Sequence, residues 1–440
     1  MTGPTSGWIL RTPTKVTTVM GTAAGGPSTA ADIVKAVLYD ASGRVVQNRQ
    51  PSDTTGTTAG TRVTTYYTKA ANTTFPTCGS HPEWAGLICR TGPAAQPSGT
   101  TIPVSVTTYN RYDEPVVVTE TSGSTVRTTT TGYDVAGRVT STKTSDNITA
   151  DVAVPEQDVD YDPATGAAVK TRSVNIGGTT IATVTTSYDA IGRVVSQDDG
   201  NGNTATTTYT IDGQPRTVTD NQATTTYTYD GTTGEHRGLV TSIDAGIGSG
   251  VPSVTTATYD RAGTPTITYP NGVVASRVVD TAGTLLSLSY VDSAGTNFAE
   301  WDQTFNAYGQ VVTSTGPSAA GNRTVTYAYD PAGRLTTASD QMATQCTVRG
   351  YGLDGDSNRT SQYAWVGADQ AGCPTSATVA ASSTARTSTY DTYDRATTTT
   401  VSGTGAGTAS YSYDTLGRAT SVPQVDVAGS APVAAGLTYF

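Results

Sequence analysis

A six-residue pattern, Tyr-Asp-x-x-Gly-Arg, recurs along the 440-residue chain and constrains its fold more than any other feature. Full matches begin at five positions: Tyr39, Tyr133, Tyr188, Tyr329 and Tyr413. Degenerate copies fill the intervals and begin at Tyr109, Tyr161, Tyr209, Tyr229, Tyr259, Val279, Phe305, Tyr351 and Tyr390. Most starts lie roughly 20 to 30 residues apart, which is the period of repeat architectures. The chain is therefore predicted to be a repeat array.

The hexamer predicts a tight turn. Asp followed by Gly three residues later is typical of a type I turn, and Gly can take the left-handed conformation that follows it. This combination is the three-residue hairpin loop with a bulge. Strand-forming segments such as Thr206–Tyr209 and Arg193–Gln197 flank the hexamers, and a second turn such as Asp198–Asn203 follows. Each repeat is thus expected to be two short strands and two turns.

Composition favours an all-β fold. Thr makes up about a fifth of the chain, and it is a good strand former and a poor helix former. Only 14% of residues are charged and 24 are Tyr, whereas disordered chains are usually charge-rich and aromatic-poor. A helical bundle, a coiled coil and a membrane-helix protein are excluded. We predict one long, strongly curved antiparallel sheet with under roughly a tenth of residues helical.

The repeated Tyr, Asp, Gly and Arg are expected to hold the sheet together, because a catalytic site is rarely copied a dozen times. The tyrosine rings should pack on one another from repeat to repeat while each hydroxyl reaches a polar partner. The arginines should bridge to the Asp or to a neighbouring repeat's carbonyls. The structural residues so predicted are Tyr39, Asp40, Gly43, Arg44, Tyr133, Asp134, Gly137, Arg138, Tyr188, Asp189, Gly192, Arg193, Tyr329, Asp330, Gly333, Arg334, Tyr413, Asp414, Gly417 and Arg418.

These hexamers, separated by Thr-rich strands, resemble the YD-repeat or RHS (rearrangement hotspot) family. Three further segments resemble it too: Tyr269–Val273, Gly355–Thr360 and Cys78–Leu87. The resemblance covers residues 37–440, with residues 1–36 as an N-terminal lead-in segment. The family includes bacterial polymorphic toxins, shell components of insecticidal toxin complexes and animal teneurins. It implies a long spiralling antiparallel sheet of hairpins, forming a curved shell wall or part of a β-cocoon.

The resemblance also implies a function. Bacterial shells of this family enclose a variable C-terminal toxin, so the chain is expected to be a structural, non-enzymatic shell segment of a secreted or cell-surface protein. Its partner would be the remainder of a larger RHS protein, including the toxin. The family's closing box, R-x-Y-D-P-x-x-G-R-F-x-x-x-D-P, is not found, and the chain stops at Leu437–Phe440 as if another repeat began. We therefore expect a fragment of shell wall.

A second class of function is a carbohydrate-binding or adhesion module that recognises a cell-surface glycan. Tyrosine-rich sheets offer stacking faces for sugars, so the direction in which the aromatic rings point discriminates the two classes. Inward rings support a container, whereas an exposed groove lined by rings supports glycan binding. An enzyme ranks a distant third.

Four cysteines form two local pairs in insertions near residues 68–103 and 341–385. The even count suggests disulfides and an exported setting, with Cys78 paired to Cys89 and Cys346 to Cys373. Free thiols, or a zinc site of Cys78, His81 and Cys89, are the alternatives, although a structural zinc needs a fourth ligand. A Cys/His nucleophile there would lack an orienting partner. No metal or cofactor is expected.

Other candidates for chemistry are weak. The net charge of −10 argues against a nucleic-acid partner, and no apolar run or N-terminal segment reads as a membrane span or signal peptide. His236 lies in a predicted turn, and two histidines are too few for a histidine-rich metal enzyme. Asp330 opens a segment that resembles an Asp-Pro-x-Gly motif, and some RHS shells use aspartates near their C-terminal core for self-cleavage, but Asp330 lies in the usual hexamer register. Asp198 and Asp199 are adjacent and so predict turn chemistry rather than glycosidase chemistry.

Overall fold

The computed structural model is almost entirely strand, and the all-β prediction is confirmed. It describes residues 14–20, 32–148, 154–174, 178–220, 222–231, 237–246, 253–318, 321–342, 345–367, 384–403, 406–423 and 434–436. Over these residues the helical elements are two single 3-10 turns, η1 (Pro76–Cys78) and η2 (Pro82–Trp84). Thirty strands belong to one antiparallel sheet, and a further three form a small second sheet.

The strands are short, as expected for hairpin repeats. The first nine are β1 (Lys15–Thr18), β2 (Ile33–Tyr39), β3 (Val45–Arg49), β4 (Thr61–Tyr66), β5 (Ile88–Pro93), β6 (Val104–Tyr109), β7 (Pro115–Ser122), β8 (Thr125–Tyr133) and β9 (Val139–Asp146). The next fourteen are β10 (Glu156–Tyr161), β11 (Ala168–Val174), β12 (Thr180–Tyr188), β13 (Val194–Asp198), β14 (Thr204–Tyr209), β15 (Pro215–Thr219), β16 (Thr224–Tyr229), β17 (Val240–Asp244), β18 (Val254–Tyr259), β19 (Pro265–Thr268), β20 (Val274–Val279), β21 (Leu285–Val291), β22 (Asn297–Phe305) and β23 (Val311–Ser318). The last ten are β24 (Gly321–Tyr329), β25 (Leu335–Met342), β26 (Gln345–Leu353), β27 (Arg359–Gly367), β28 (Thr384–Tyr390), β29 (Ala396–Gly403), β30 (Gly407–Ser410), β31 (Ser412–Tyr413), β32 (Ala419–Pro423) and β33 (Ala434–Gly436).

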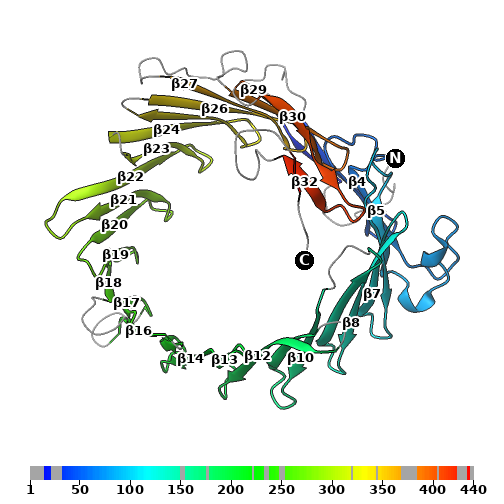
Figure 1. Cartoon of the computed structure of the whole chain (residues 1–440), viewed down its shortest axis with the longest axis horizontal. Helices are drawn as coiled ribbons and strands as arrows, with labels where there is room; N and C mark the ends of the chain where they lie inside the picture. The colour runs from blue at the N-terminus through cyan, green and yellow to red at the C-terminus, as the bar shows by residue number, and fades with distance from the viewer. Residues whose placement is uncertain are drawn as a thin grey trace. The chain divides into compact units, whose positions relative to one another are not determined.

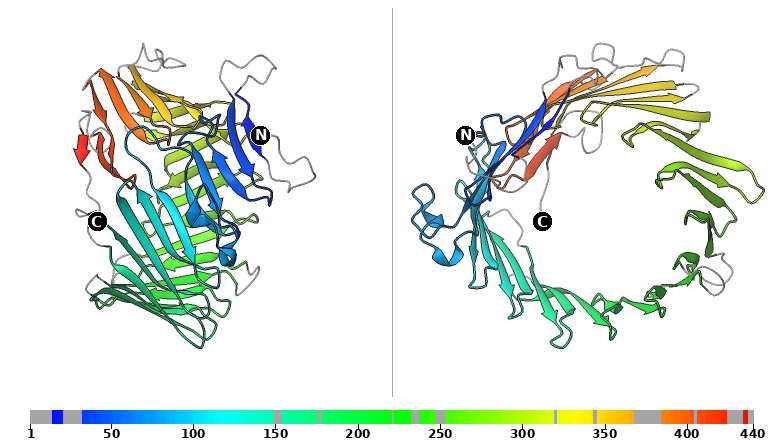
Figure 2. Two further views of the ribbon diagram at one scale, coloured as in Figure 1. Left: turned by 90° about the vertical axis from the view of Figure 1, so that its right-hand side faces the viewer. Right: turned by 180° about the vertical axis from the view of Figure 1, so that it is seen from behind.

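The chain divides into two compact units. The first comprises residues 1–154, 327–339 and 345–440, and the second comprises residues 155–326 and 340–344. Within the second unit the strands β10 to β22 follow one another in chain order (Figure 1). Figure 2 shows the same succession from two other directions.

The hexamers form the turns at one edge of the sheet. Each even-numbered strand from β2 to β28 ends at the first position of a hexamer, and so does β31. In β4 that residue is Tyr66, and the Cys78–Cys89 insertion follows it. In β26 it is Leu353, two residues beyond Tyr351, where the sequence predicted the copy to begin. We call the turns after these strands the repeat turns, and we call the turns that follow the odd-numbered strands up to β29 the opposite turns. Because strands alternate in direction, all repeat turns lie at one edge and all opposite turns at the other.

The turn after β12 shows the local geometry. The Asp189 N–H donates to the Arg193 carbonyl at 2.9 Å, and the Gly192 N–H donates to the Asp189 carbonyl at 3.0 Å. Gly192 has a φ of +84°, and the strand register shifts between Ser187 and Tyr188. These are the features of a type I turn closed by a left-handed residue and a bulge.

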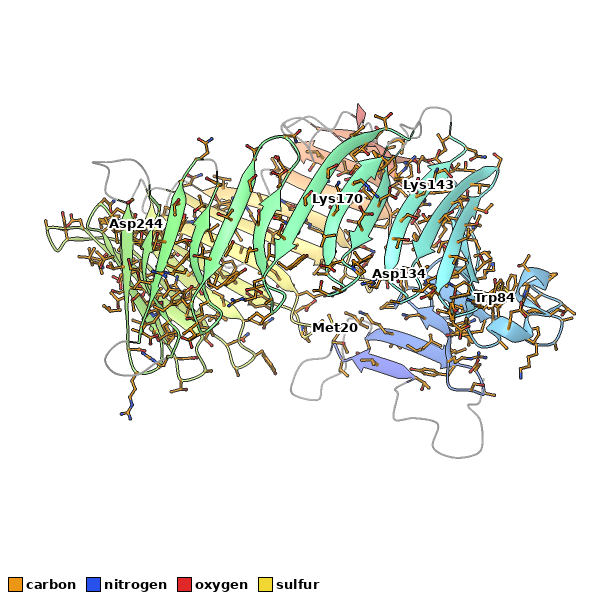
Figure 3. All side chains as sticks on the ribbon, turned by 90° about the horizontal axis from the view of Figure 1, so that it is seen from below. Met20, Trp84, Asp134, Lys143, Lys170 and Asp244 are labelled. Atoms are coloured by element: carbon orange, nitrogen blue, oxygen red, sulfur yellow. A yellow bond between two sulfur atoms is a disulfide. The ribbon has the colours of Figure 1, made fainter. Side chains whose placement is uncertain are left out.

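The sheet is a single layer over much of its length, so its core is small. Among the described residues of the second unit, only Ala275, Val325 and Asp340 are buried. Compact clusters occur instead where insertions leave the repeat, around Cys78–Cys89 and around Cys346. Figure 3 shows Trp84 on a lobe that projects away from the strands of the sheet.

Candidate functional site

Repeat turns are held by the side chains of their own Asp and Arg. Asp189 Oδ1 accepts hydrogen bonds from the N–H groups of Ile191 and Arg193, both at 3.0 Å, and Asp189 Oδ2 accepts one from Arg193 Nε at 2.7 Å. Corresponding Asp–Arg pairs occur at Asp40/Arg44, Asp134/Arg138, Asp330/Arg334, Asp391/Arg395 and Asp414/Arg418. Each predicted Asp and Arg of the full hexamers thus lies in one recurring arrangement.

These contacts favour the ionised form of Asp189 and of Asp134. The Arg193 N–H is the largest cause that lowers the pKa of Asp189, and the Arg193 guanidinium and the Ile191 N–H lower it further against some desolvation. The Arg138 side chain lowers the pKa of Asp134 in the same way. A carboxylate held ionised by three donors is a poor general acid or base near neutral pH. The Asp and Arg side chains of these turns are therefore engaged with the turns themselves.

The tyrosine of each repeat connects it to the preceding repeat. Tyr209 Oη donates to the Val194 carbonyl at 2.6 Å, and Val194 directly follows the Arg193 of the preceding turn. The same bond joins Tyr66 to Val45, Tyr133 to Pro115, Tyr188 to Ala168, Tyr259 to Val240 and Tyr413 to Ala396.

At repeats whose preceding hexamer ends in Arg, that arginine can cover the tyrosine ring. Arg193 Cζ lies 4.3 Å from the centre of the Tyr209 ring, and Arg44 lies at the same distance from Tyr66. The sequence predicts that successive tyrosines pack on each other, and at these repeats the structure differs. The tyrosines recur on every second strand, about 9.6 Å apart, which exceeds the roughly 7 Å reach of a ring pair, so the guanidinium fills the space. We call this series of contacts the repeat ladder: Asp binds Arg in one turn, that Arg covers the Tyr of the next repeat, and the Tyr hydroxyl donates to a backbone carbonyl of the preceding repeat.

Degenerate repeats keep the interaction with other residues. Asn110 Nδ2 donates to Glu114 Oε2 at 2.6 Å, and Asn306 Nδ2 donates to Gln310 Oε1 at 2.8 Å. Asn358 donates to Asp354 at 3.0 Å. Sequence reasoning treated these copies as degraded matches and missed the pairing. The sequence does contain a signal for this pairing. A side chain that can donate a hydrogen bond and one that can accept it stand four residues apart, in either order.

The three described cysteines lie in disulfides. Cys78 and Cys89 are bonded, with their Cα atoms 5.6 Å apart. Cys346 is also disulfide-bonded, while its predicted partner Cys373 lies outside the described residues. His81 Nδ1 lies 2.9 Å from Glu83 Oε1, and its ring stacks on Trp84. In the part of the chain that the structure describes, no three His, Cys, Asp or Glu side chains gather as metal ligands.

The other candidate residues are engaged in turns. Asp330 makes the same bonds to Arg334 as its counterparts do, at 2.9 and 2.7 Å. Asp198 accepts from Gly200 N and Thr204 Oγ1, at 2.8 and 2.7 Å. Asp199 accepts from Asn201 N and Asn203 Nδ2, at 2.8 and 2.7 Å. His236 lies outside the described residues.

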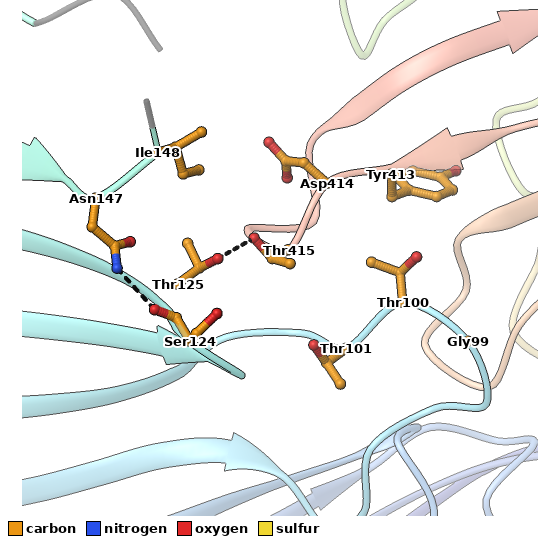
Figure 4. A pocket seen from close by; sticks show the side chains of 10 residues that line it. All are labelled: Gly99, Thr100, Thr101, Ser124, Thr125, Asn147, Ile148, Tyr413, Asp414 and Thr415. Atoms are coloured by element: carbon orange, nitrogen blue, oxygen red, sulfur yellow. Dashed lines mark hydrogen bonds between the residues drawn. The ribbon is translucent and has the colours of Figure 1, made fainter. Parts of the chain in front are cut away.

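A polar pocket of about 780 Å³ opens in the first unit (Figure 4). Its lining consists of Gly99, Thr100, Thr101, Ser124, Thr125, Asn147, Ile148, Tyr413, Asp414 and Thr415. Several of these polar groups are already paired: Thr415 Oγ1 with Thr125 Oγ1 at 2.7 Å, and Asn147 Nδ2 with the Ser124 carbonyl at 2.8 Å. Asp414 is held by Arg418 at 2.6 Å. The pocket thus presents a junction between turns and no catalytic constellation.

No helix among the described residues has both the length and the apolar character needed to cross a membrane.

Comparison with known proteins places the fold. No family model matches the sequence, and no curated protein matches it. The crystal structure of TcdB2-TccC3-Cdc42 is similar over 91% of the chain, at 13% identity and a TM-score of 0.54. That of TcdB2-TccC3 is similar over 88%, at 16% identity and a TM-score of 0.50. The chain spans 22% of the length of each of these proteins. It therefore shares its fold with one part of much longer chains.

Proposed function

We propose that the chain is a structural segment of the wall of a toxin-complex shell. It would belong to a larger YD-repeat (RHS) protein that encloses or presents a C-terminal toxin, and it would perform no chemistry itself. The similarity in fold to TcdB2-TccC3 supports this assignment, as does the family resemblance of the hexamers.

The repeat ladder is the observation that carries the proposal. In the turn after β12, the Asp189 carboxylate, the Arg193 guanidinium and the Tyr209 hydroxyl are all used to hold one repeat to the next. Such a site has no free group for substrate, and its repetition extends a sheet. An extended sheet that is mostly a single layer suits a wall, because each added repeat enlarges the area of the wall without adding to a hydrophobic core.

An exported setting fits the same proposal. Disulfides such as Cys78–Cys89 form and persist mainly in oxidising compartments. The partners would be the remainder of the larger protein and its toxin.

Electron cryomicroscopy of the intact protein, expressed from its full reading frame, tests this function. We expect β10 to β23 to lie in the wall of a hollow particle with the toxin inside. A particle in which these strands surround no enclosed volume would contradict the proposal.

The alternative is a glycan-binding face, and one observation favours it. In the second unit, Tyr290 contacts Tyr269, Phe298 and Trp301, with ring centres 6.4, 6.4 and 5.7 Å apart respectively. Phe298 and Trp301 are also exposed, as sugar-stacking rings are. A glycan array of the wild-type chain, with Trp301→Ala as the control, tests the glycan-binding alternative. Binding by the wild type that the variant loses would support it, and no binding by the wild type would contradict it.

A further inference from the structure

A small polar pocket of about 240 Å³ lies on the sheet of the first unit, across β27 to β30, which are neighbours in that sheet (Figure 1). Its lining consists of Arg359, Gln362, Arg386, Ser388, Tyr390 and Tyr411. Two of these residues carry a positive charge, and no acidic residue is among the described residues of the lining. The whole chain, by contrast, has a net charge of −10. The pocket is therefore a cationic place in an acidic protein.

Arg359 stands where other repeats carry an apolar residue. It is the first residue after its hexamer, and after the hexamers that follow β12, β14 and β16 the same place holds Val194, Pro215 and Val240. The backbone role of the place is kept, because the Arg359 carbonyl accepts the Tyr390 hydroxyl at 3.0 Å, as in the repeat ladder. The charged side chain is therefore an addition to the repeat and no part of its turn.

The side chain of Arg359 pairs with a neutral group. Its Nη1 donates to Gln362 Oε1 at 3.0 Å, and its Cζ lies 5.7 Å from the centre of the Tyr351 ring. Another strand arginine pairs with a carboxylate instead: Arg127 Nε lies 2.6 Å from Glu120 Oε2. An arginine has five N–H donors, and the bond to Gln362 uses one. In the part of the chain that the structure describes, the charge of Arg359 is thus uncompensated, and most of its donors face no acceptor.

Arg386 brings a second guanidinium to the pocket in a fixed position. Gln362 is its partner on the neighbouring strand, so the two side chains lie side by side on one face of the sheet. Arg386 Nε donates to Thr399 Oγ1 at 2.8 Å, and its Nη2 donates to Tyr411 Oη at 3.2 Å. Thr399 is fully buried, and both acceptors are neutral. These bonds orient the guanidinium before any ligand arrives, which lowers the entropic cost of binding.

We propose that this pocket binds a small molecule through an oxyanion group, a carboxylate or a phosphate. Arg359 and Arg386 hold the group between them, because the N–H donors of a guanidinium match the paired oxygens of either group. Ser388 lies two residues from Arg386 on the same face of β28 and donates a further hydrogen bond from its hydroxyl. The ligand is small, because 240 Å³ is about the volume of eight water molecules in the liquid. This inference does not depend on whether the sheet encloses a toxin.

Equilibrium dialysis of the full chain against radiolabelled inorganic phosphate, and separately against radiolabelled acetate, tests the proposal at constant ionic strength. We expect one saturable site per chain for at least one probe, and the tighter probe identifies the oxyanion. Arg359→Gln should weaken that binding at least tenfold with the melting temperature unchanged, because Arg359 is exposed. Arg216→Gln, at an exposed arginine of β15, is the matched control and should bind as the wild type does. A chain that binds neither probe, or an Arg359→Gln variant with unchanged affinity, overturns the proposal.

Arg386→Gln tests the second guanidinium. This change also removes a bond to the buried Thr399, so the melting temperature should fall, and binding is measured well below it. We expect the affinity for the tighter probe to fall at least tenfold again. Unchanged affinity in Arg386→Gln would mean that Arg359 attracts anions alone, and it would contradict a site built from both arginines.

Discussion

The lobe of residues 67–89 and the repeat ladder between Tyr188 and Tyr209 are stabilised in different ways. In the lobe, Tyr67 is 2% exposed and its ring contacts His81, Trp84 and Tyr109 beside the Cys78–Cys89 disulfide. In the ladder, the side chains are half-buried and joined by hydrogen bonds and cation–π contact. Hydrophobic burial is thus concentrated where the chain leaves the repeat, and the repeat relies on local polar geometry copied many times.

The difference predicts two kinds of failure. A lobe with its own small core should lose its structure as one cooperative unit. A ladder in which each repeat contacts only its neighbours should pass damage to the adjacent repeats.

Tyr67→Ala should have the largest effect on the lobe. It removes a buried ring and the hydrogen bond from Tyr67 Oη to the Thr107 carbonyl, so the free energy of unfolding should fall by about 3–5 kcal/mol. Urea denaturation followed by tryptophan fluorescence measures it through Trp84. Tyr67→Phe is the control and should cost about 1 kcal/mol, the share of the hydrogen bond. Equal losses in both variants would mean that ring burial does not stabilise the lobe.

Removing the disulfide should come next. Cys78→Ser with Cys89→Ser should destabilise the lobe by about 2–4 kcal/mol, because the bond closes a short loop in the unfolded chain. Limited proteolysis should then cut within residues 67–89 first and leave the ladder of the second unit intact. Simultaneous cleavage in the second unit would show that the two regions are not independent.

Gly192→Ala tests the backbone of the ladder. Gly192 has a φ of +84° and an added Cβ would meet nothing within 4 Å, so the cost should be backbone strain alone, about 1 kcal/mol. Gly192→Asn should cost less, because Asp113 and Asp394 occupy the same hexamer position at φ values of +64° and +62°. Thermal unfolding compares the variants, and a larger loss for Asn than for Ala would refute the argument.

Asp394→Asn should have the smallest effect and a stabilising one. Burial raises the pKa of Asp394; the Asn358 hydrogen bond lowers it, and the carboxylates of Asp356, Asp354 and Asp391 raise it again. Because the folded-state pKa of Asp394 lies above the ordinary value of an aspartate, ionisation of this carboxyl opposes folding.

The same change should also turn over the Gln50 amide. Gln50 Nε2 donates to Asp394, while Gln50 Oε1 is buried and has no hydrogen-bond partner among the described residues. An Asn amide at 394 would donate to Gln50 Oε1 after the turn, and Gln50 Nε2 would then occupy the place without a partner, so the expected gain comes from removing the buried charge. The gain should be about 0.5–1 kcal/mol above the raised pKa and should diminish as pH falls below it. A pH series of melting temperatures checks it, and destabilisation at pH 7 would contradict the reading.

Much of the fold was predictable because the hexamer encodes it locally. The turns and the all-β architecture follow from Asp, Gly and the Thr-rich flanks. The contact of Arg193 with the Tyr209 ring did not follow, because it depends on the distance between alternate strands. Contacts between turns far apart in the chain were not predictable either: Gln50 and Asp394 are 344 residues apart, and no local pattern links them.

Residue-resolved hydrogen exchange of Arg193→Ala tests the central claim, that the repeat ladder holds neighbouring repeats together. Arg193 contacts Asp189 in its own turn and Tyr209 in the next repeat. Arg216→Ala, at an exposed arginine of β15, is the control. We predict faster exchange in the turn after β12 and also in β14 and β15, with no change in the lobe or in the control. Faster exchange confined to residues 189–193, with β14 as protected as in the wild type, would contradict the account.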